Sequence, residues 1–462
     1  MNFAERHSFG INKAFLKKSV SDDKEYLQVA LDIEKSIRRH AVESETEFFW
    51  KENVIGKPGP VNVSLGYGQA GILYFYLQLF EATQDESFVP LIEKSVNYIR
   101  NHWKEGLPPE PHRYTWPDAM AYGIYSGISG TGDVLLLVYR RFKFETAELA
   151  LNEIYEYLKA KAVAVDGGVK WTGSPVSLAD GGVLMFLTAF YEIKPSEDLK
   201  NFLSLAGKAY LALGIPHENG GLEFSDFETA KLAEPDFPHK VSQPNFELGS
   251  AGAGFVLARL YQTLKDDAYL DAAKKVEVYL DSIKINQAKG FLLPYRVGDP
   301  NATVYYLGNC HGAAGTAKFY YILGKISGDK TYFEKLHQLF DGFESFGAPD
   351  RMSGGFWNNP SVCCGNAGVL NTTIGLYENL GEKRWADLAQ KSAEILLGER
   401  DLVENGIYGW PIAYRRIAPT EFSHTIFYND GDAGIAASLL RVYFKSQNIK
   451  NPNSLAEDPF GV

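Results

Sequence analysis

A short glycine motif recurs seven times along the 462 residues of the chain. Each copy ends in glycine and precedes a mainly apolar run, and neighbouring copies lie roughly 60 residues apart. A period of this length across a whole chain is typical of a repeat architecture, in which each unit buries its apolar face against the next. The seven copies occupy residues 68–71, 127–130, 179–182, 251–254, 312–315, 365–368 and 431–434.

The runs after the motifs are apolar on every side, which predicts buried helices. The stretches between them place apolar residues at steps of three and four, which predicts amphipathic helices in an outer layer. Seven such pairs predict an all-α fold, a closed α/α toroid of seven inner and seven outer helices with short hairpins or turns at one face. We expect a single domain over residues 1–462, with an extra N-terminal helix at 20–44 and a loose tail at 446–462.

The charge and the apolar content exclude several classes of function. The formal net charge of −11 argues against nucleic acid and anionic membranes as partners. No apolar run approaches the roughly 20 residues that a bilayer requires, so we expect no membrane insertion. Residues 1–18 have no uninterrupted apolar core and do not read as a secretory signal. Three cysteines, two of them adjacent, do not form a disulfide framework, which favours a cytoplasmic protein.

All three cysteines stand just ahead of a motif glycine: Cys310 in the fifth repeat, and Cys363 and Cys364 in the sixth. In a toroid these positions rim the same end of the central axis, so three sulfurs can meet around one ion. Three protein ligands with one open position is the catalytic zinc arrangement, and we predict Zn2+. Two alternatives remain: buried structural cysteines, or a structural zinc with His311 as fourth ligand.

At these residues the chain resembles the lanthionine synthetase C family, the cyclases of lanthipeptide biosynthesis. The likeness covers most of the chain, and the cysteine-Gly and Cys-Cys-Gly motifs carry its specificity. The resemblance implies that Cys310, Cys363 and Cys364 bind zinc, with Cys364 replacing the usual histidine. It implies that a peptide thiol adds to dehydroalanine or dehydrobutyrine, forming lanthionine or methyllanthionine. The implied substrate is a dehydrated precursor peptide, delivered by a separate dehydratase.

The chain departs from the family pattern where proton transfer is concerned. A fourth-repeat histidine is usual, and we assign its place to Ser250. A common second-repeat aspartate is absent near Gly123 and Ser126, and Tyr305-Tyr306-Leu307-Gly308 stands where an arginine often precedes the fifth-repeat cysteine. The addition nevertheless creates an enolate that must be protonated. His311 is the best candidate acid or base, and the weaker ones are Asp430, His424 and Asp180.

Two other functions compete with the cyclase. The first is a non-cyclising zinc protein of the same family that binds thiols such as glutathione, or peptide partners. The second is a toroid glycosidase that uses two carboxylates across a cleft, for which Asp180 and Asp430 are available. The glycosidase gives no role to the cysteines.

Overall fold

A computed structural model gives the fold. It describes residues 16–20, 22–51, 62–105, 107, 120–226, 242–298, 304–352, 356–404, 406–413, 418 and 421–461.

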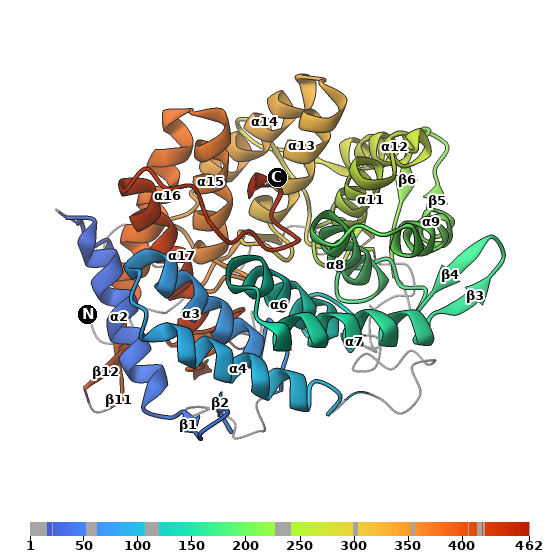
Figure 1. Ribbon diagram of the computed structural model, residues 1–462. Helices are drawn as coiled ribbons and strands as arrows, with labels where there is room; N and C mark the ends of the chain where they lie inside the picture. The colour runs from blue at the N-terminus through green and yellow to red at the C-terminus, as the bar shows by residue number, and fades with distance from the viewer. Residues whose placement is uncertain are drawn as a thin grey trace.

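The helices of the described residues form two concentric rings, which confirms the predicted all-α toroid (Figure 1). Seven inner helices are buried along most of their length because their sequences are apolar on every side. They are α3 (Gln69–Thr83), α6 (Ile128–Phe142), α8 (Asp180–Ile193), α11 (Ser250–Leu264), α13 (Ala313–Ser327), α15 (Asn366–Leu380) and α17 (Asp432–Ser446).

Seven outer helices cover the inner ring with one apolar face and turn charged residues to the surface. They are α2 (Lys24–Arg38), α4 (Phe88–His102), α7 (Glu145–Lys161), α9 (Glu197–Leu211), α12 (Asp267–Ile283), α14 (Thr331–Ser345) and α16 (Lys383–Glu399). The helix expected at 20–44 is the shorter α2. It packs against α17 and α3 and is therefore the seventh outer helix, which closes the ring rather than adding to it.

Among the described residues, short strand pairs lie in the segments between outer and inner helices, which confirms the predicted short hairpins or turns. Six pairs are antiparallel, and β9 (Tyr305–Tyr306) pairs in parallel with β10 (Phe356–Trp357). The antiparallel pairs are β1 (Val42–Glu43) with β2 (Phe48–Phe49), β3 (Val163–Val165) with β4 (Gly168–Lys170), β5 (Ile215–Pro216) with β6 (Leu222–Glu223), β7 (Ile285–Asn286) with β8 (Phe291–Leu292), β11 (Asp401–Glu404) with β12 (Ile407–Gly409), and β13 (Ile412–Ala413) with β14 (Phe422–Ser423).

The first polar side chain of several inner helices holds the backbone of the segment before it. Asp180 accepts hydrogen bonds from the backbone N–H groups of residues 171–173 and from the Thr172 hydroxyl. Ser250 bonds the N–H and carbonyl groups of Phe224, and Asp432 accepts from the Trp410 N–H. Asp180 and Ser250 therefore serve as structural links between a strand pair and a helix start.

The third residue of each inner helix is glycine because the preceding loop passes too close for a side chain. A Cβ at Gly315 would overlap the carbonyl oxygen of Asn309, six residues earlier, and the same overlap recurs in five other repeats. The fourth-repeat helix begins at Ser250 with Gly249 as N-cap. Its motif is therefore 249–252, and the expected 251–254 is wrong by two residues.

A belt of seven backbone hydrogen bonds links the loops ahead of the inner helices around the whole ring. Each bond joins one repeat to the next, with N···O distances of 2.6 to 3.0 Å. In the second repeat two neighbouring residues share this role. The Tyr125 carbonyl accepts from Gly66, and the Ile124 N–H donates to Ser177. The belt runs through Gly66, Ile124 and Tyr125, Ser177, Glu247, Cys310, Cys363 and Asn429. Closing the ring thus fixes two of the cysteines directly.

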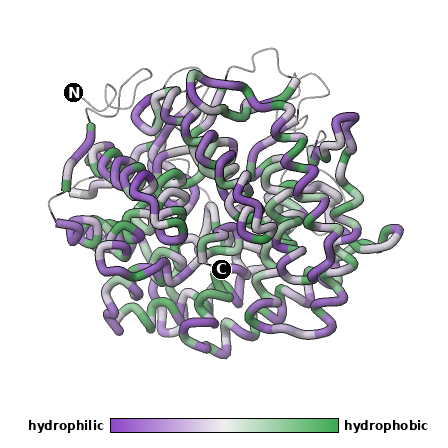
Figure 2. Tube along the Cα trace, turned by 90° about the horizontal axis from the view of Figure 1, so that it is seen from above, coloured by the Kyte–Doolittle hydropathy of each residue, from purple (hydrophilic) through white to green (hydrophobic). Residues whose placement is uncertain are grey.

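The C-terminal residues do not form the loose tail that their polar composition suggests. They turn back into the axis of the ring and end in the 3₁₀ turn η2 (Pro459–Gly461), as Figures 1 and 2 show. Leu455, Ala456 and Phe460 are buried, and the Tyr74 hydroxyl of α3 donates to the Asn453 carbonyl oxygen at 3.0 Å. The segment fills the space that seven inner helices leave between them. Within the described residues, no helix is long and apolar enough to cross a membrane.

Candidate metal centre

The three thiols meet at the starts of two neighbouring inner helices. Cys310 Sγ lies 3.4 Å from Cys364 Sγ, which lies 3.5 Å from Cys363 Sγ. All three sulfurs fall within 4.8 Å of one another, and their residues are 2%, 8% and 5% exposed for Cys310, Cys364 and Cys363. The repeat register predicts this convergence, and the belt explains it, because the Cys310 N–H donates to the Cys363 carbonyl oxygen at 3.0 Å.

This donor set fits zinc. Zn–S bonds of about 2.3 Å in a tetrahedron separate the sulfurs by about 3.8 Å, close to the separations seen here. Within the described chain, no carboxylate oxygen or imidazole nitrogen joins the three sulfurs inside the same 4.8 Å limit. A structural site with His311 as fourth ligand therefore lacks support. Three sulfurs with one free position match the catalytic arrangement.

The thiols differ in their affinity for protons. Hydrogen bonding with Cys310 and Cys363 lowers the pKa of Cys364 to about 6. Burial raises the pKa of Cys310 well above its usual value. Near neutral pH the Cys364 thiol is therefore ionised and hydrogen-bonded with the other two thiols. A bound cation would replace the protons of those two thiols.

His311 follows Cys310 and is buried between two tyrosine rings, with ring centroids 4.7 Å from Tyr295 and 5.3 Å from Tyr306. Burial, with a smaller contribution from the positive charge of Arg296, lowers the pKa of His311 to about 3. The imidazole is thus neutral near pH 7. Its Nδ1 atom has no hydrogen-bond partner among the described residues.

Asp430 and His424 occupy different surroundings. Asp430 stands one place ahead of the α17 N-cap, the position that Cys364 holds in α15. Its Oδ1 accepts from the Thr425 hydroxyl at 3.2 Å, and burial raises its pKa to about 6. His424 Nε2 lies 2.7 Å from Asp432 Oδ2, so this histidine ties the end of β14 to the first turn of α17.

Sequence reasoning missed two residues of this region, Glu247 beside the thiols and Arg296 near His311. The Cys363 thiol contacts Glu247 Oε2 at 4.0 Å, and Glu247 holds the belt position that the cysteines hold in the next two repeats. With the fourth motif placed at 251–254, Glu247 does not align with the cysteines. With the motif at 249–252, it does. Correcting the register also moves the family's histidine position from Ser250 to Leu248. Arg296, buried and stacked on Tyr295 at 4.6 Å, comes from a loop well ahead of Cys310 and has no sequence signal.

Apolar side chains wall the thiols on one side. Met352, Trp357 and Ala413 are buried against the sulfurs, with the half-buried rings of Tyr306 and Phe422 at the edge. Of the aromatic residues near this end of the ring, Tyr125, Tyr305, Trp410 and Tyr428 are also buried in the core. Tyr306 and Phe422, by contrast, are only partly buried at the edge of this wall.

Fold and site together define a class of protein: an α/α toroid with a three-cysteine centre at one end of its axis. Residues 59–455 match the lanthionine synthetase C-like protein family. The chain therefore belongs to this family.

Of the similar solved structures, nisin cyclase agrees with the fold. Nisin cyclase superposes with a TM-score of 0.63 at 16% identity, covering 92% of this chain and 95% of that one. An α-1,6-mannanase of Salegentibacter sp. HEL1_6, in an inactive variant, gives 0.41 at 14% identity, covering 81% and 98%. A D-mannose isomerase gives 0.43 at 15% identity, covering 70% and 87%. No curated protein matches the sequence.

Proposed function

We propose that the protein is a zinc-dependent lanthipeptide cyclase. In the reaction a peptide cysteine adds across the double bond of a dehydroalanine or dehydrobutyrine in the same peptide. A C–S bond forms at the β-carbon, the thiol proton is released, and a proton is delivered to the α-carbon. No group leaves, and the product is a lanthionine or methyllanthionine ring. The proposed substrate is a precursor peptide already dehydrated by a separate enzyme.

One observation carries the proposal: three thiols of neighbouring repeats lie within 4.8 Å of one another, and among the described residues no fourth donor lies within that distance of all three. Bound there, zinc would lower the pKa of an incoming thiol and keep it as the nucleophilic thiolate. The apolar wall of Met352, Trp357 and Tyr306 would keep water from the reacting carbon.

The proton that completes the reaction needs a donor beside the thiols. We assign this role to His311: its neutral ring adjoins Cys310, and its Nδ1, which has no hydrogen-bond partner among the described residues, can take the proton released by the incoming thiol and then deliver it to the α-carbon. Asp430 is the second candidate, since its raised pKa keeps part of the population protonated near pH 6. His424 is the weakest candidate because Asp432 already holds its Nε2.

A test combines metal analysis with a thiol assay. The purified protein should contain one zinc per chain, and Cys364→Ala should lose it. The wild-type protein should consume the free thiol of a dehydrated peptide that contains one cysteine, as followed by alkylation and mass spectrometry. A protein that holds zinc and leaves the thiol free would contradict the cyclase.

One observation favours a second function, the non-cyclising thiol-binding protein. The fourth-repeat residue ahead of the N-cap is Leu248, which cannot transfer a proton, whereas the next three repeats carry His311, Cys364 and Asp430 there. Tight binding of glutathione to the zinc-loaded protein without peptide cyclisation would support it.

A further inference from the structure

Glu457 of the C-terminal segment contacts a residue next to the metal centre, Asn309. This side chain is 4% exposed, and its Oε2 atom collects three donors. Asn309 Nδ2 lies 3.0 Å away, Lys318 Nζ lies 3.2 Å away, and the Tyr125 hydroxyl donates as well. The carboxylate thus joins the chain end to loops of the second and fifth repeats and to the inner helix α13.

These partners are parts of the site. Asn309 directly precedes Cys310, and its Nδ2 atom also lies 2.8 Å from the Tyr125 hydroxyl and 3.4 Å from Glu247 Oε1. Glu247 in turn contacts the Cys363 thiol. A chain of polar contacts therefore connects Glu457 with Asn309, which precedes Cys310, and continues through Glu247 to the Cys363 thiol.

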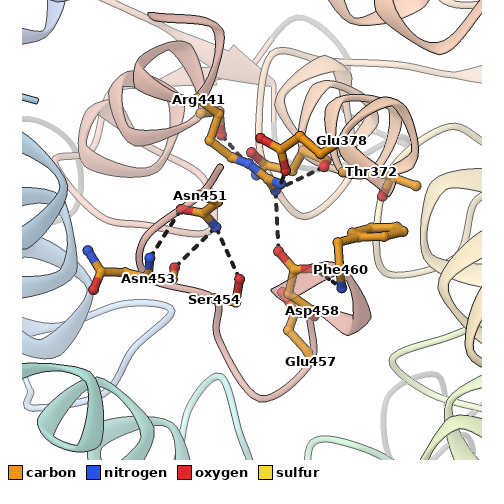
Figure 3. A network of polar contacts seen from close by, with 12 residues as sticks. Thr372, Glu378, Arg441, Asn451, Asn453, Ser454, Glu457, Asp458 and Phe460 are labelled. Carbon is orange, nitrogen blue, oxygen red and sulfur yellow. Dashed lines mark hydrogen bonds and ion pairs between the residues drawn. The ribbon is translucent and has the colours of Figure 1, made fainter. Parts of the chain in front are cut away.

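A separate clamp holds the segment in the axis. Arg441 of α17 lies 3.3 Å from Asp458 Oδ2 and 3.3 Å from Glu378 Oε2 (Figure 3). Asn379 Nδ2 donates to the Phe460 carbonyl oxygen at 3.0 Å, and Asp133 of α6 accepts from the Ala456 N–H at 2.8 Å. Docking of the segment thus has anchors that do not involve Asn309, Tyr125 or Lys318.

We propose that Glu457 is a positioning residue of the metal centre: a carboxylate from the C-terminal segment that fixes Asn309 and, through it, the orientation of Cys310. The inference rests on the proposed metal site but not on the cyclase reaction. Partners that orient metal ligands affect metal affinity by about 10- to 100-fold. Glu457 also pairs with the buried Lys318, so removing the carboxylate leaves the lysine charge buried without its partner. The resulting loss of stability must be distinguished from a loss of ligand orientation.

Four variants of the full chain make this separation. Glu457→Leu removes the acceptor at nearly constant size. Glu457→Gln keeps an acceptor oxygen and tests for rescue. The double variant Glu457→Leu with Lys318→Met also removes the unpaired charge. Asp458→Leu is the matched control, because it removes the neighbouring carboxylate, which contacts the Arg441 clamp.

Zinc affinity is measured by competition with a chromophoric chelator, ligand geometry by the absorption spectrum of the cobalt-loaded protein, and stability by thermal unfolding. We expect Glu457→Leu to weaken zinc binding about tenfold and to alter the cobalt spectrum. Glu457→Gln should restore most of the affinity. The double variant should regain thermal stability but not affinity, and Asp458→Leu should lower only the stability.

Three outcomes would overturn the inference. The first two are zinc binding by Glu457→Leu equal to that of the wild type, and an equal loss of zinc affinity in Asp458→Leu. Recovery of affinity in the double variant would also overturn it, since the loss would then come from the unpaired lysine. A wild-type protein that binds no zinc would instead refute the metal site, and with it the proposed function. A wild type that binds zinc but cyclises nothing leaves the inference intact.

Discussion

The backbone N–H of Cys310 donates to the carbonyl oxygen of Cys363 at 3.0 Å, although the two residues begin different repeats. The bond is one link of the seven-membered belt. It places two sulfur-bearing residues side by side before any metal binds. Preorganisation of this kind lowers the entropic cost of collecting ligands from distant parts of a chain.

The first prediction concerns the glycine behind this bond. Gly315→Ala would push a methyl group into the Asn309 carbonyl oxygen and shift the loop that bears Cys310. We expect the free energy of unfolding to fall by about 3 kcal/mol, with weaker zinc binding. Ala314→Gly, one residue earlier in the same helix, should cost only about 1 kcal/mol. Denaturant unfolding of both variants measures the difference, and equal losses would contradict the steric argument.

The second prediction concerns the third sulfur. Cys364→His replaces a thiolate by a neutral ring, so the loaded centre loses one negative charge and polarises a bound thiolate more strongly. Zinc should be retained, and thiol addition should slow about tenfold. Cys364→Ala should lose the metal. Rates of thiol loss, normalised to zinc content, test this; a faster Cys364→His enzyme would show that thiolate reactivity does not limit the rate.

The third prediction concerns proton transfer. His311→Gln keeps hydrogen-bonding capacity but removes a group that can exchange protons, and we expect cyclisation to slow roughly 100-fold with zinc content unchanged. The comparison variant is His337→Gln on the outer helix α14, whose imidazole is paired with Glu382. An unchanged cyclisation rate in His311→Gln would transfer the role to Asp430.

The fourth prediction concerns pH. Burial raises the pKa of Asp133 from 3.8 to about 7. Between about pH 4 and pH 7 this carboxyl therefore keeps its proton in the folded protein but has lost it in the unfolded chain. The free energy of unfolding falls as the pH rises through that window. Asp133→Asn stays neutral and keeps an acceptor for the Ala456 N–H.

We expect the free energy of unfolding of Asp133→Asn to exceed that of the wild type by about 4 kcal/mol at pH 8 and to match it near pH 4. Urea unfolding at both pH values measures this. Asp271→Asn, exposed on α12, should leave the pH dependence as it is. A gain of equal size at both pH values would exclude ionisation of Asp133 as the cause.

Much of the architecture is predictable from the sequence because the repeat encodes it locally. Glycine motifs and apolar runs give the inner helices, and their shared register brings Cys310 to Cys363 and Cys364. The fourth repeat misleads because two overlapping small-residue motifs, 249–252 and 251–254, compete there. Gly249 takes the extended N-cap conformation, whereas Gly254 lies inside the helix and makes room for the Phe319 ring.

Contacts between distant segments are the part that sequence could not supply. Glu457 lies in a polar stretch that looks disordered by composition, and its burial depends on donors from Tyr125, Asn309 and Lys318. Arg296 likewise reaches His311 from another loop. Neither position is marked by the periodic pattern of the sequence, because each depends on side chains that meet only once the ring has closed.

The filled axis has a consequence for how a long peptide would be handled. Because the C-terminal segment occupies the axis between the inner helices (Figure 1), a peptide bound by the proposed cyclase would approach and depart from the side of the thiols. A precursor with several cysteines would then be released and rebound for each crosslink. The order of crosslinking would follow from the competition among its own segments for one opening, not from threading.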